Sequence, residues 1–196
     1  MQAIEIIQDE HRKLWRVATT VDIVADEIDA GGALTPAFFN AVFDYIETFV
    51  DQAHHPKEND YLFHRVRQRS SQGDALLARL DADHEGGPAR LQVLRASLGR
   101  AEQGERAAFT QALRAYTEGL KQHIRLEERE LIPLAREVLT EGDWDEIGSA
   151  FLNNKDPLFG DQAREEYREL YHRIVALAPE SVGLGSQSAG ELKKGA

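Results

Sequence analysis

The segment HHPKENDYLF, residues 54–63, places two histidines, a proline and a glutamate inside a stretch that otherwise has the pattern of an amphipathic helix. On either side of it, apolar residues recur in steps of three and four, the period of an α-helix. The inward-facing positions of this stretch are Phe39, Phe43, Ile46, Val50, His54, Glu58 and Tyr61. A spacing of four turns an α-helix by about 400° and rises about 6 Å, so His54 and Glu58 project from the same, apolar face.

Three further stripes of this kind predict three more long helices within the first 140 residues. The first contains Ile4, Ile7, His11, Leu14, Ala18, Val21, Ala25 and Ile28, the third Leu77, Leu80, His84, Gly87, Leu91, Leu94 and Leu98, and the fourth Phe109, Leu113, Tyr116, Leu120, His123, Glu127, Leu131 and Leu134. No segment alternates with a period of two, so strands are not expected. Four long helices joined by short loops predict an all-α fold, an up-down-up-down four-helix bundle.

Turn-forming residues mark the ends of these helices. The breaks are expected at Gly31–Gly32, at Ser70–Gly73, near Gly104 and near Gly142. Thr35 and Pro36 have the chemistry of an N-cap and a first helical residue, and Asp74 is expected to cap the third helix.

The predicted domain organisation is a four-helix bundle over residues 1–140, a C-terminal helical extension over 141–178 and a flexible tail over 179–196. The extension is expected to hold a short helix from Asp143 to Phe151 and another from about residue 161 to 177. The Ser/Gly-rich end of the chain has the composition of a flexible segment.

Composition narrows the class of protein. The chain has 196 residues, of which 42% are hydrophobic and 29% charged, enough for one packed domain with a short appendage. A net charge of −11 disfavours nucleic acid as a partner. No apolar run is long enough to span a membrane and the start lacks the pattern of a secretory signal, so no membrane association and a cytoplasmic location are expected. The absence of cysteine excludes thiolate metal sites.

Each of the four stripes is interrupted by a histidine where packing favours an apolar residue: His11, His54, His84 and His123. Two of these histidines are followed four residues later by a glutamate, Glu58 or Glu127. A carboxylate on an apolar face is costly unless it is paired, protonated or bound to a metal.

The six residues are expected to meet at one level of the bundle, because residues at one level of antiparallel helices lie equally far from the connecting loop. The midpoints between the polar positions of successive helices fall at about residues 33.5, 70 and 104.5, inside or beside the three predicted loops. Imidazole and carboxylate ligands favour iron, with manganese and zinc as alternatives. The sequence therefore predicts a metal site made of His11, His54, Glu58, His84, His123 and Glu127.

These residues resemble the hemerythrin-like, or HHE cation-binding, family over about residues 1–140. The resemblance is carried by DEHRKLW (His11), HHPKENDYLF (His54, Glu58), DHEGG (His84) and HIRLEERELIPLA (His123, Glu127). It implies a bundle with two non-haem iron ions bridged by Glu58 and Glu127, with His11 and His123 on one iron and His54 and His84 on the other. Oxygen-carrying members have a fifth histidine and an aspartate bridge, which makes this chain look more like the bacterial branch.

The resemblance implies a protein that binds or reacts with O2, peroxide or nitric oxide. Whether it is an enzyme stays open; an enzymatic version would be a peroxide- or NO-consuming oxidoreductase in which the metals, and no side-chain acid or base, carry the chemistry. One alternative is an iron- or oxygen-responsive sensor or interaction module that contacts a protein partner, or a second copy, through its C-terminal helices. Another is an iron store or donor, including iron–sulfur cluster repair.

Several neighbours of the predicted ligands carry their own expectations. His55 is expected at the rim of the site, with replacement of His54 as the alternative. Pro56 is expected either to kink the helix and open the bundle or simply to be tolerated. Gly86–Gly87–Pro88 either leaves a pocket for a small ligand or breaks the third helix. Glu10, Asp83 and Glu128 are expected on a solvated face, with contact to a histidine N–H near the metals as the alternative.

Overall fold

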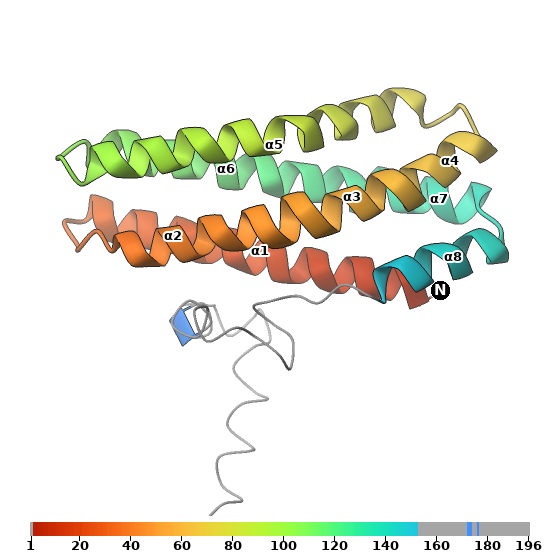
Figure 1. The fold of residues 1–196 in the computed structure, drawn as a ribbon, viewed down its shortest axis with the longest axis horizontal. Coiled ribbons are helices and arrows are strands. Elements are labelled where there is room, and N and C mark those ends of the chain that lie inside the picture. The colour runs from red at the N-terminus through yellow and green to blue at the C-terminus, as the bar shows by residue number, and fades with distance from the viewer. Residues whose placement is uncertain (1, 153–171, 174–175, 177–196) are drawn as a thin grey trace, which may run out of the picture.

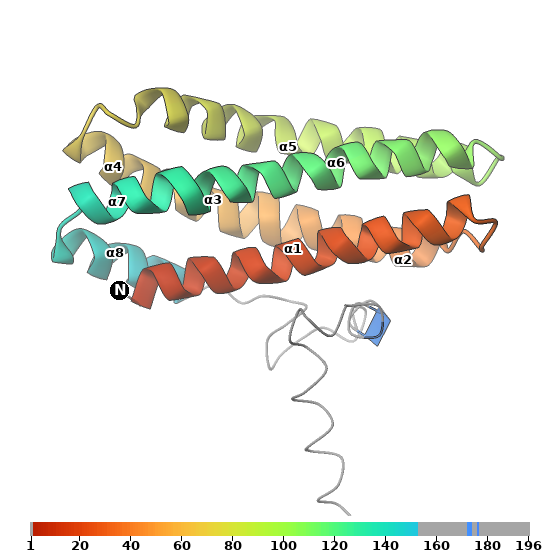
Figure 2. The same cartoon turned by 180° about the vertical axis from the view of Figure 1, so that it is seen from behind.

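Four antiparallel helical rods form the bundle, as the sequence predicts (Figure 1, and from behind in Figure 2). The computed structural model describes residues 2–152, 172, 173 and 176. The rods are α1 (Gln2–Asp29), the segments from α2 to α4 (residues 36–69), α5 (Asp74–Ala101) and the segments from α6 to α7 (residues 106–138). No strand occurs among the described residues, and the all-α prediction is confirmed.

The second and fourth rods are not uniform α-helices. The second consists of α2 (Pro36–Tyr45), the π-helical η1 (Ile46–His54), α3 (His55–Lys57), the π-helical η2 (Glu58–Phe63) and α4 (His64–Arg69). The fourth consists of α6 (Arg106–Leu126), the π-helical η3 (Glu127–Leu131) and α7 (Ile132–Val138). In a π-helix the backbone bond spans five residues instead of four, and such segments occur often at functional sites.

The loops between the rods match the sequence prediction in position, at Gly31–Gly32, at Ser70–Gly73 and around Gly104. The break after the fourth rod falls at residues 139–140, so Gly142 is already helical. Gly31 adopts a φ of 90°, a conformation that suits glycine, directly after α1. Thr35 is the N-cap and Pro36 the first residue of the second rod, although the Thr35 side chain makes no capping hydrogen bond. Asp74 is not the cap of α5, because Gly73 holds that position and Asp74 is already helical.

Two other expectations are corrected. Gly86, Gly87 and Pro88 do not break the third rod, since α5 continues through them from Asp74 to Ala101. The short C-terminal helix, α8 (Glu141–Phe151), starts two residues earlier than predicted, because Thr140 and Asp143 form a reciprocal capping box at its start. The second predicted helix of the extension and the tail lie outside the described residues.

A polar layer separates two apolar clusters along the bundle. One cluster includes Leu14, Val50 and Leu91, and the other includes Ile7, Leu62 and Leu80. On the first three rods the predicted metal residues fall between these positions. On the fourth rod His123 and Glu127 lie on either side of Ile124, which belongs to the first cluster, and both precede Leu131 of the second cluster. The second cluster also takes up Ile147 and Phe151, so α8 packs against α1 as part of the folded core. Within the part of the chain that the structure describes, no helix has both the length and the apolar composition to cross a membrane.

Candidate metal centre

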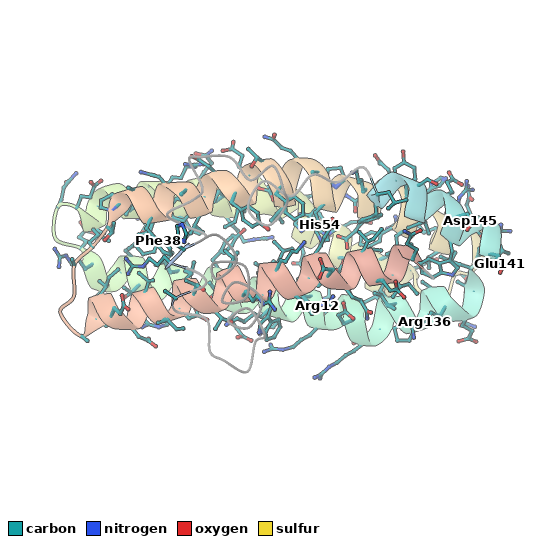
Figure 3. All side chains as sticks on the ribbon, turned by 90° about the horizontal axis from the view of Figure 1, so that it is seen from below. Arg12, Phe38, His54, Arg136, Glu141 and Asp145 are labelled. Carbon is teal, nitrogen blue, oxygen red and sulfur yellow. The ribbon has the colours of Figure 1, made fainter. Side chains whose placement is uncertain are left out.

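The structure brings all six predicted residues together in the interior. Each is at most 6% exposed, and Glu58 is fully buried. In Figure 3, His54 lies inside the bundle between the rods, whereas Arg12 lies on the outer surface. The convergence is made by four separate rods, since α1 carries His11, the second rod His54 and Glu58, α5 His84, and the fourth rod His123 and Glu127.

Glu58 lies at the middle of the cluster. Its Oε1 lies 3.4 Å from Nε2 of His11, and its Oε2 lies 3.4 Å from Nε2 of His54 and 3.7 Å from Nε2 of His84. Glu127 lies against two histidines, with Oε2 3.2 Å from Nε2 of His11 and Oε1 3.4 Å from Nε2 of His123. Glu127 therefore has one oxygen facing His11 and the other facing His123, and Glu58 contacts histidines from three rods.

The potential ligand atoms fall into two groups that share Glu58. One group holds His11, His54 and Glu58, and the other holds His55, Glu58, His84 and His123, with all ligand atoms of a group within 4.8 Å of one another. His84 and His123 are especially close, with 2.9 Å between their Nε2 atoms. This grouping differs from the division that the family resemblance implied, because His11 is grouped with His54, and His84 with His123.

The donor set fits a metal. Among the described residues, Oε2 of Glu58 and both carboxylate oxygens of Glu127 are buried without a hydrogen-bond partner. Such oxygens are costly unless something satisfies them. Ligand atoms bound at 2.0–2.2 Å to one ion lie about 3 Å apart when at right angles, which is close to the separations of 2.9–3.7 Å between the facing nitrogens and oxygens.

The outer nitrogen of each predicted histidine ligand faces an acceptor. Nδ1 of His11 lies 2.7 Å from Glu128, that of His54 lies 2.9 Å from Glu10, that of His84 lies 2.8 Å from Asn59, and that of His123 lies 3.4 Å from Asp83. Ionised carboxylates only accept, so the ring Nδ1–H donates and Nε2 is left for the interior. The alternative expectation, contact with a histidine, holds for Glu10, Asp83 and Glu128. The solvated face is wrong for Glu10, which is buried, whereas Asp83 and Glu128 are partly exposed.

The charges of the cluster are strongly coupled. Burial lowers the pKa of His11, but its bonds to the surrounding carboxylates outweigh burial and raise that pKa well above its ordinary value. For His123 burial is likewise outweighed, chiefly by Glu127, and the pKa is raised to about 9. Burial and the neighbouring His123 lower the pKa of His84 to about 3. Burial alone would raise the pKa of Glu127, yet His123 and His11 hold it well below its usual range. The Glu127 carboxylate is thus ionised and available to a cation.

His55 is buried beside the predicted ligands. Adjacent residues of an α-helix point about 100° apart, so a regular helix would direct His55 away from the face of His54. Here His55 follows the π-helical η1, and its N–H bonds to the carbonyl of Val50, five residues earlier. The wider turn brings both histidines into the interior. Pro56, which lacks an N–H, lies directly after this turn.

The orientation of His55 differs from that of the other histidines. Its ring stacks on His84, with centroids 3.9 Å apart and planes 13° apart. A metal ion binds in the plane of an imidazole ring at about 2.1 Å from the nitrogen, so two stacked rings cannot both direct lone pairs at one ion. Although a nitrogen of His55 lies near the second group of ligand atoms, the stacked geometry places His55 beside the ligands rather than sharing an ion with His84.

A chamber of about 210 Å³ reaches this edge of the cluster. Its lining includes Asp51, His55, Asp83, Gly87, Tyr116 and His123. A Cβ atom at Gly87 would lie 2.9 Å from Oδ1 of Asp51, so the glycine leaves the room that Asp51 occupies. A pocket is therefore present at Gly87, one of the two outcomes expected from the glycine pair.

The comparison with family models gives one match: the model described as hemerythrin HHE cation binding domain covers residues 2–135. Neither the search of curated proteins nor the search of solved structures found a match. The match covers the first three rods, the fourth rod up to residue 135, and all six predicted metal residues. The chain therefore belongs to the hemerythrin HHE cation-binding family, and its His/Glu cluster is the place where such a cation can be held.

Proposed function

We propose that the chain is a non-haem di-iron protein that binds or reacts with O2, peroxide or nitric oxide. In this proposal His11 and His54 hold one iron, His84 and His123 hold the other, and Glu58 and Glu127 bridge the two. Support comes from the two groups of ligand atoms that share Glu58 and from the position of Glu127 between His11 and His123. Iron is preferred because the donors are imidazoles and carboxylates without thiolates.

The observation that carries the functional part of the proposal is the chamber beside His123. A metal site that serves only stability is closed by its protein ligands, whereas a reactive site keeps a position for water or substrate. Iron held by two histidines and two carboxylate oxygens would have room for a small ligand. When bound, the irons supply Lewis-acid and redox chemistry to the small ligand.

The roles of the protein follow from the described contacts. The four histidine rings are fixed by acceptors on their outer nitrogens, which prepares the site before a metal arrives. The apolar clusters on both sides of the polar layer hinder the entry of water along the bundle axis. From the sides, the chamber reaches His123 and a second pocket reaches His11. The chain thus holds the metals, sets their spacing and controls which ligands arrive.

The test is metal analysis of the purified protein followed by exposure of its iron form to each ligand. Peroxide consumption with turnover identifies an enzyme, and a spectral change without turnover identifies a carrier or sensor. Spontaneous transfer of iron to an acceptor protein identifies a donor. Iron-loaded protein that shows no spectral change with any of the three ligands would contradict the proposal.

A further inference from the structure

Two buried polar groups at the edge of the metal cluster have no hydrogen-bond partner among the described residues. They are the carboxylate of Asp51, whose two oxygens both lack a hydrogen bond, and Nδ1 of His55. The Asp51 side chain is 7% exposed and the His55 side chain 11% exposed. A buried polar group without a partner costs stability, so both groups call for a molecule that can satisfy them.

The two groups face one another across a short gap inside the chamber. Oδ1 of Asp51 lies 3.7 Å from Nδ1 of His55, too far for a direct hydrogen bond but suited to one small bridging molecule. Both residues line the chamber, whose volume is sufficient for several water-sized molecules. The chamber also includes Asp83 and Arg90, which are both solvent-accessible, so a molecule from outside can reach the gap.

The chemistry of the gap selects its occupant. An ionised carboxylate only accepts hydrogen bonds, so the occupant must carry an O–H or N–H group. Nδ1 of His55, which faces Asp51 and has no hydrogen-bond partner, can donate or accept a hydrogen bond according to the tautomer of the ring. O2, nitric oxide and the azide anion cannot donate a hydrogen bond, so none of them can satisfy the Asp51 carboxylate. Hydrogen peroxide and other small hydroperoxides can bind both groups at once.

We propose that Asp51 and His55 form a binding subsite for a small, uncharged hydroperoxide at the mouth of the metal centre. The subsite rests on the proposed function, because its occupant is the ligand that would pass to the metals. Within it Asp51 and His55 are positioning residues. His55 is a separate group from the metal ligands, in keeping with its stacking on His84.

The experiment compares iron-loaded full-length wild type with Asp51→Ala, Asp51→Asn and His55→Phe. Asp60→Ala and Asp60→Asn are the matched controls, because Asp60 is an exposed carboxylate on the same rod. Three quantities are measured: iron content per chain, the azide dissociation constant from visible absorption, and the second-order rate constant for oxidation of the reduced protein by hydrogen peroxide. In that assay one hydrogen peroxide accepts two electrons, one from each of two ferrous ions, and two protons from solvent. The products are two waters and two ferric ions.

Asp51→Ala is expected to slow the peroxide reaction about tenfold, the effect expected for the loss of one hydrogen bond to a charged group. The reaction should slow even though the substitution widens the chamber. Asp51→Asn keeps the shape, removes the charge and should tighten azide binding. His55→Phe keeps the stacked ring and should keep the full iron content, whereas His84→Phe should lose iron.

Each result has a distinct meaning. An Asp51→Ala protein that reacts as fast as Asp60→Ala, or faster, would show that Asp51 only obstructs the route and would overturn the subsite. Loss of iron in His55→Phe equal to that in His84→Phe would make His55 a metal ligand and would also overturn it. Wild type that holds no iron would sink the proposed function itself, which separates that failure from failure of the subsite.

Discussion

In each of the four predicted histidine ligands, Nδ1 faces an oxygen atom of a neighbouring side chain, and this contact fixes the ring. Three of these oxygens belong to carboxylates, on Glu10, Asp83 and Glu128, and the fourth belongs to the amide of Asn59. A carboxylate behind an imidazole fixes the ring and raises its basicity as a ligand. The histidines are therefore prepared for metal through residues that contact no metal themselves.

Removal of one such carboxylate should weaken metal binding without removing a ligand. We expect Glu10→Ala to lower metal affinity about 10- to 100-fold, the effect typical of lost partners behind a metal-bound histidine. Glu5→Ala is the control, because Glu5 is exposed on the same helix. Competition with a metal chelator measures the affinity, and equal affinities for the two variants would contradict the role of Glu10.

Metal binding should release protons. The surrounding carboxylates outweigh burial and raise the pKa of His11 well above its ordinary value and that of His123 to about 9, so these two rings carry protons in the metal-free protein near neutral pH. A metal ligand must be deprotonated, so a cation displaces those protons. We expect more than one proton per chain to be released on loading, and metal affinity to rise with pH up to about 9, the pKa of His123. A pH-stat titration measures this, and loading without proton release would contradict it.

The ligand candidates could be predicted from sequence because their signal is local. His54–Glu58 and His123–Glu127 are spaced by four, and burial of a carboxylate demands a partner. The position of His55 could not be predicted from that spacing, since it depends on the wider turn of η1. The acceptors on Glu10, Asp83 and Glu128 were assigned to the surface because a position beside a ligand points sideways in an isolated helix, while in the bundle the neighbouring rod supplies the histidine.

Among the helices, the π-helical segments coincide with the candidate site. His54 ends η1, Glu58 begins η2 and Glu127 begins η3. The hydrophobic period predicts the existence and approximate ends of all four rods, because their apolar stripes are long. It does not reveal π-helical turns, which shift the face by one residue and leave the surrounding stripe nearly unchanged.

The glycine of α5 that faces the chamber gives a test at this level. Gly87→Leu should fill the chamber and displace Asp51, because even a Cβ atom at this position lies 2.9 Å from Oδ1 of Asp51. We expect slower azide binding to the iron form with unchanged iron content. Gly99→Leu is the control, since nothing lies within 4 Å of a Cβ at that position of the same helix. Stopped-flow absorption measures the rates, and equal rates for the two variants would show that ligands use another route.

At the scale of the whole molecule, α8 packs against α1 and the second rod and adds Ile147 and Phe151 to the core. Asp143 caps α8 together with Thr140 and receives two hydrogen bonds from the guanidinium of Arg69, at 2.9 and 3.0 Å. Those bonds and the bond to Thr140 hold the pKa of Asp143 below its usual range. The sequence pattern predicts the four rods and their order. It does not predict the Arg69–Asp143 ion pair, because the two residues are 74 positions apart in the chain.

Loss of the Asp143 side chain, which caps α8 and pairs with Arg69, should destabilise the bundle. We expect Asp143→Ala to lower the free energy of unfolding by about 1–2 kcal/mol at neutral pH, the cost of losing a good helix cap. Because the folded pKa of Asp143 is lowered, its contribution is present above the unfolded value of 3.8 and is lost as pH falls below it. Urea unfolding of the variant and of Asp145→Ala, an exposed control on α8, measures the difference. A deficit that persists unchanged well below that pH would contradict the charge-dependent part.

At the scale of the whole chain, a bound cation would offset the cost of burying the polar layer. Six buried imidazole and carboxylate groups from four rods interrupt an otherwise apolar interior. Metal content of the protein purified without added metal, measured by elemental analysis, is the most direct test. We predict two transition-metal ions per chain in wild type, close to none after Glu58→Gln with Glu127→Gln, and the wild-type content after Glu5→Gln with Glu130→Gln, two exposed positions. A wild-type protein without tightly bound metal, or a Glu58/Glu127 variant that keeps all of it, would contradict the assignment.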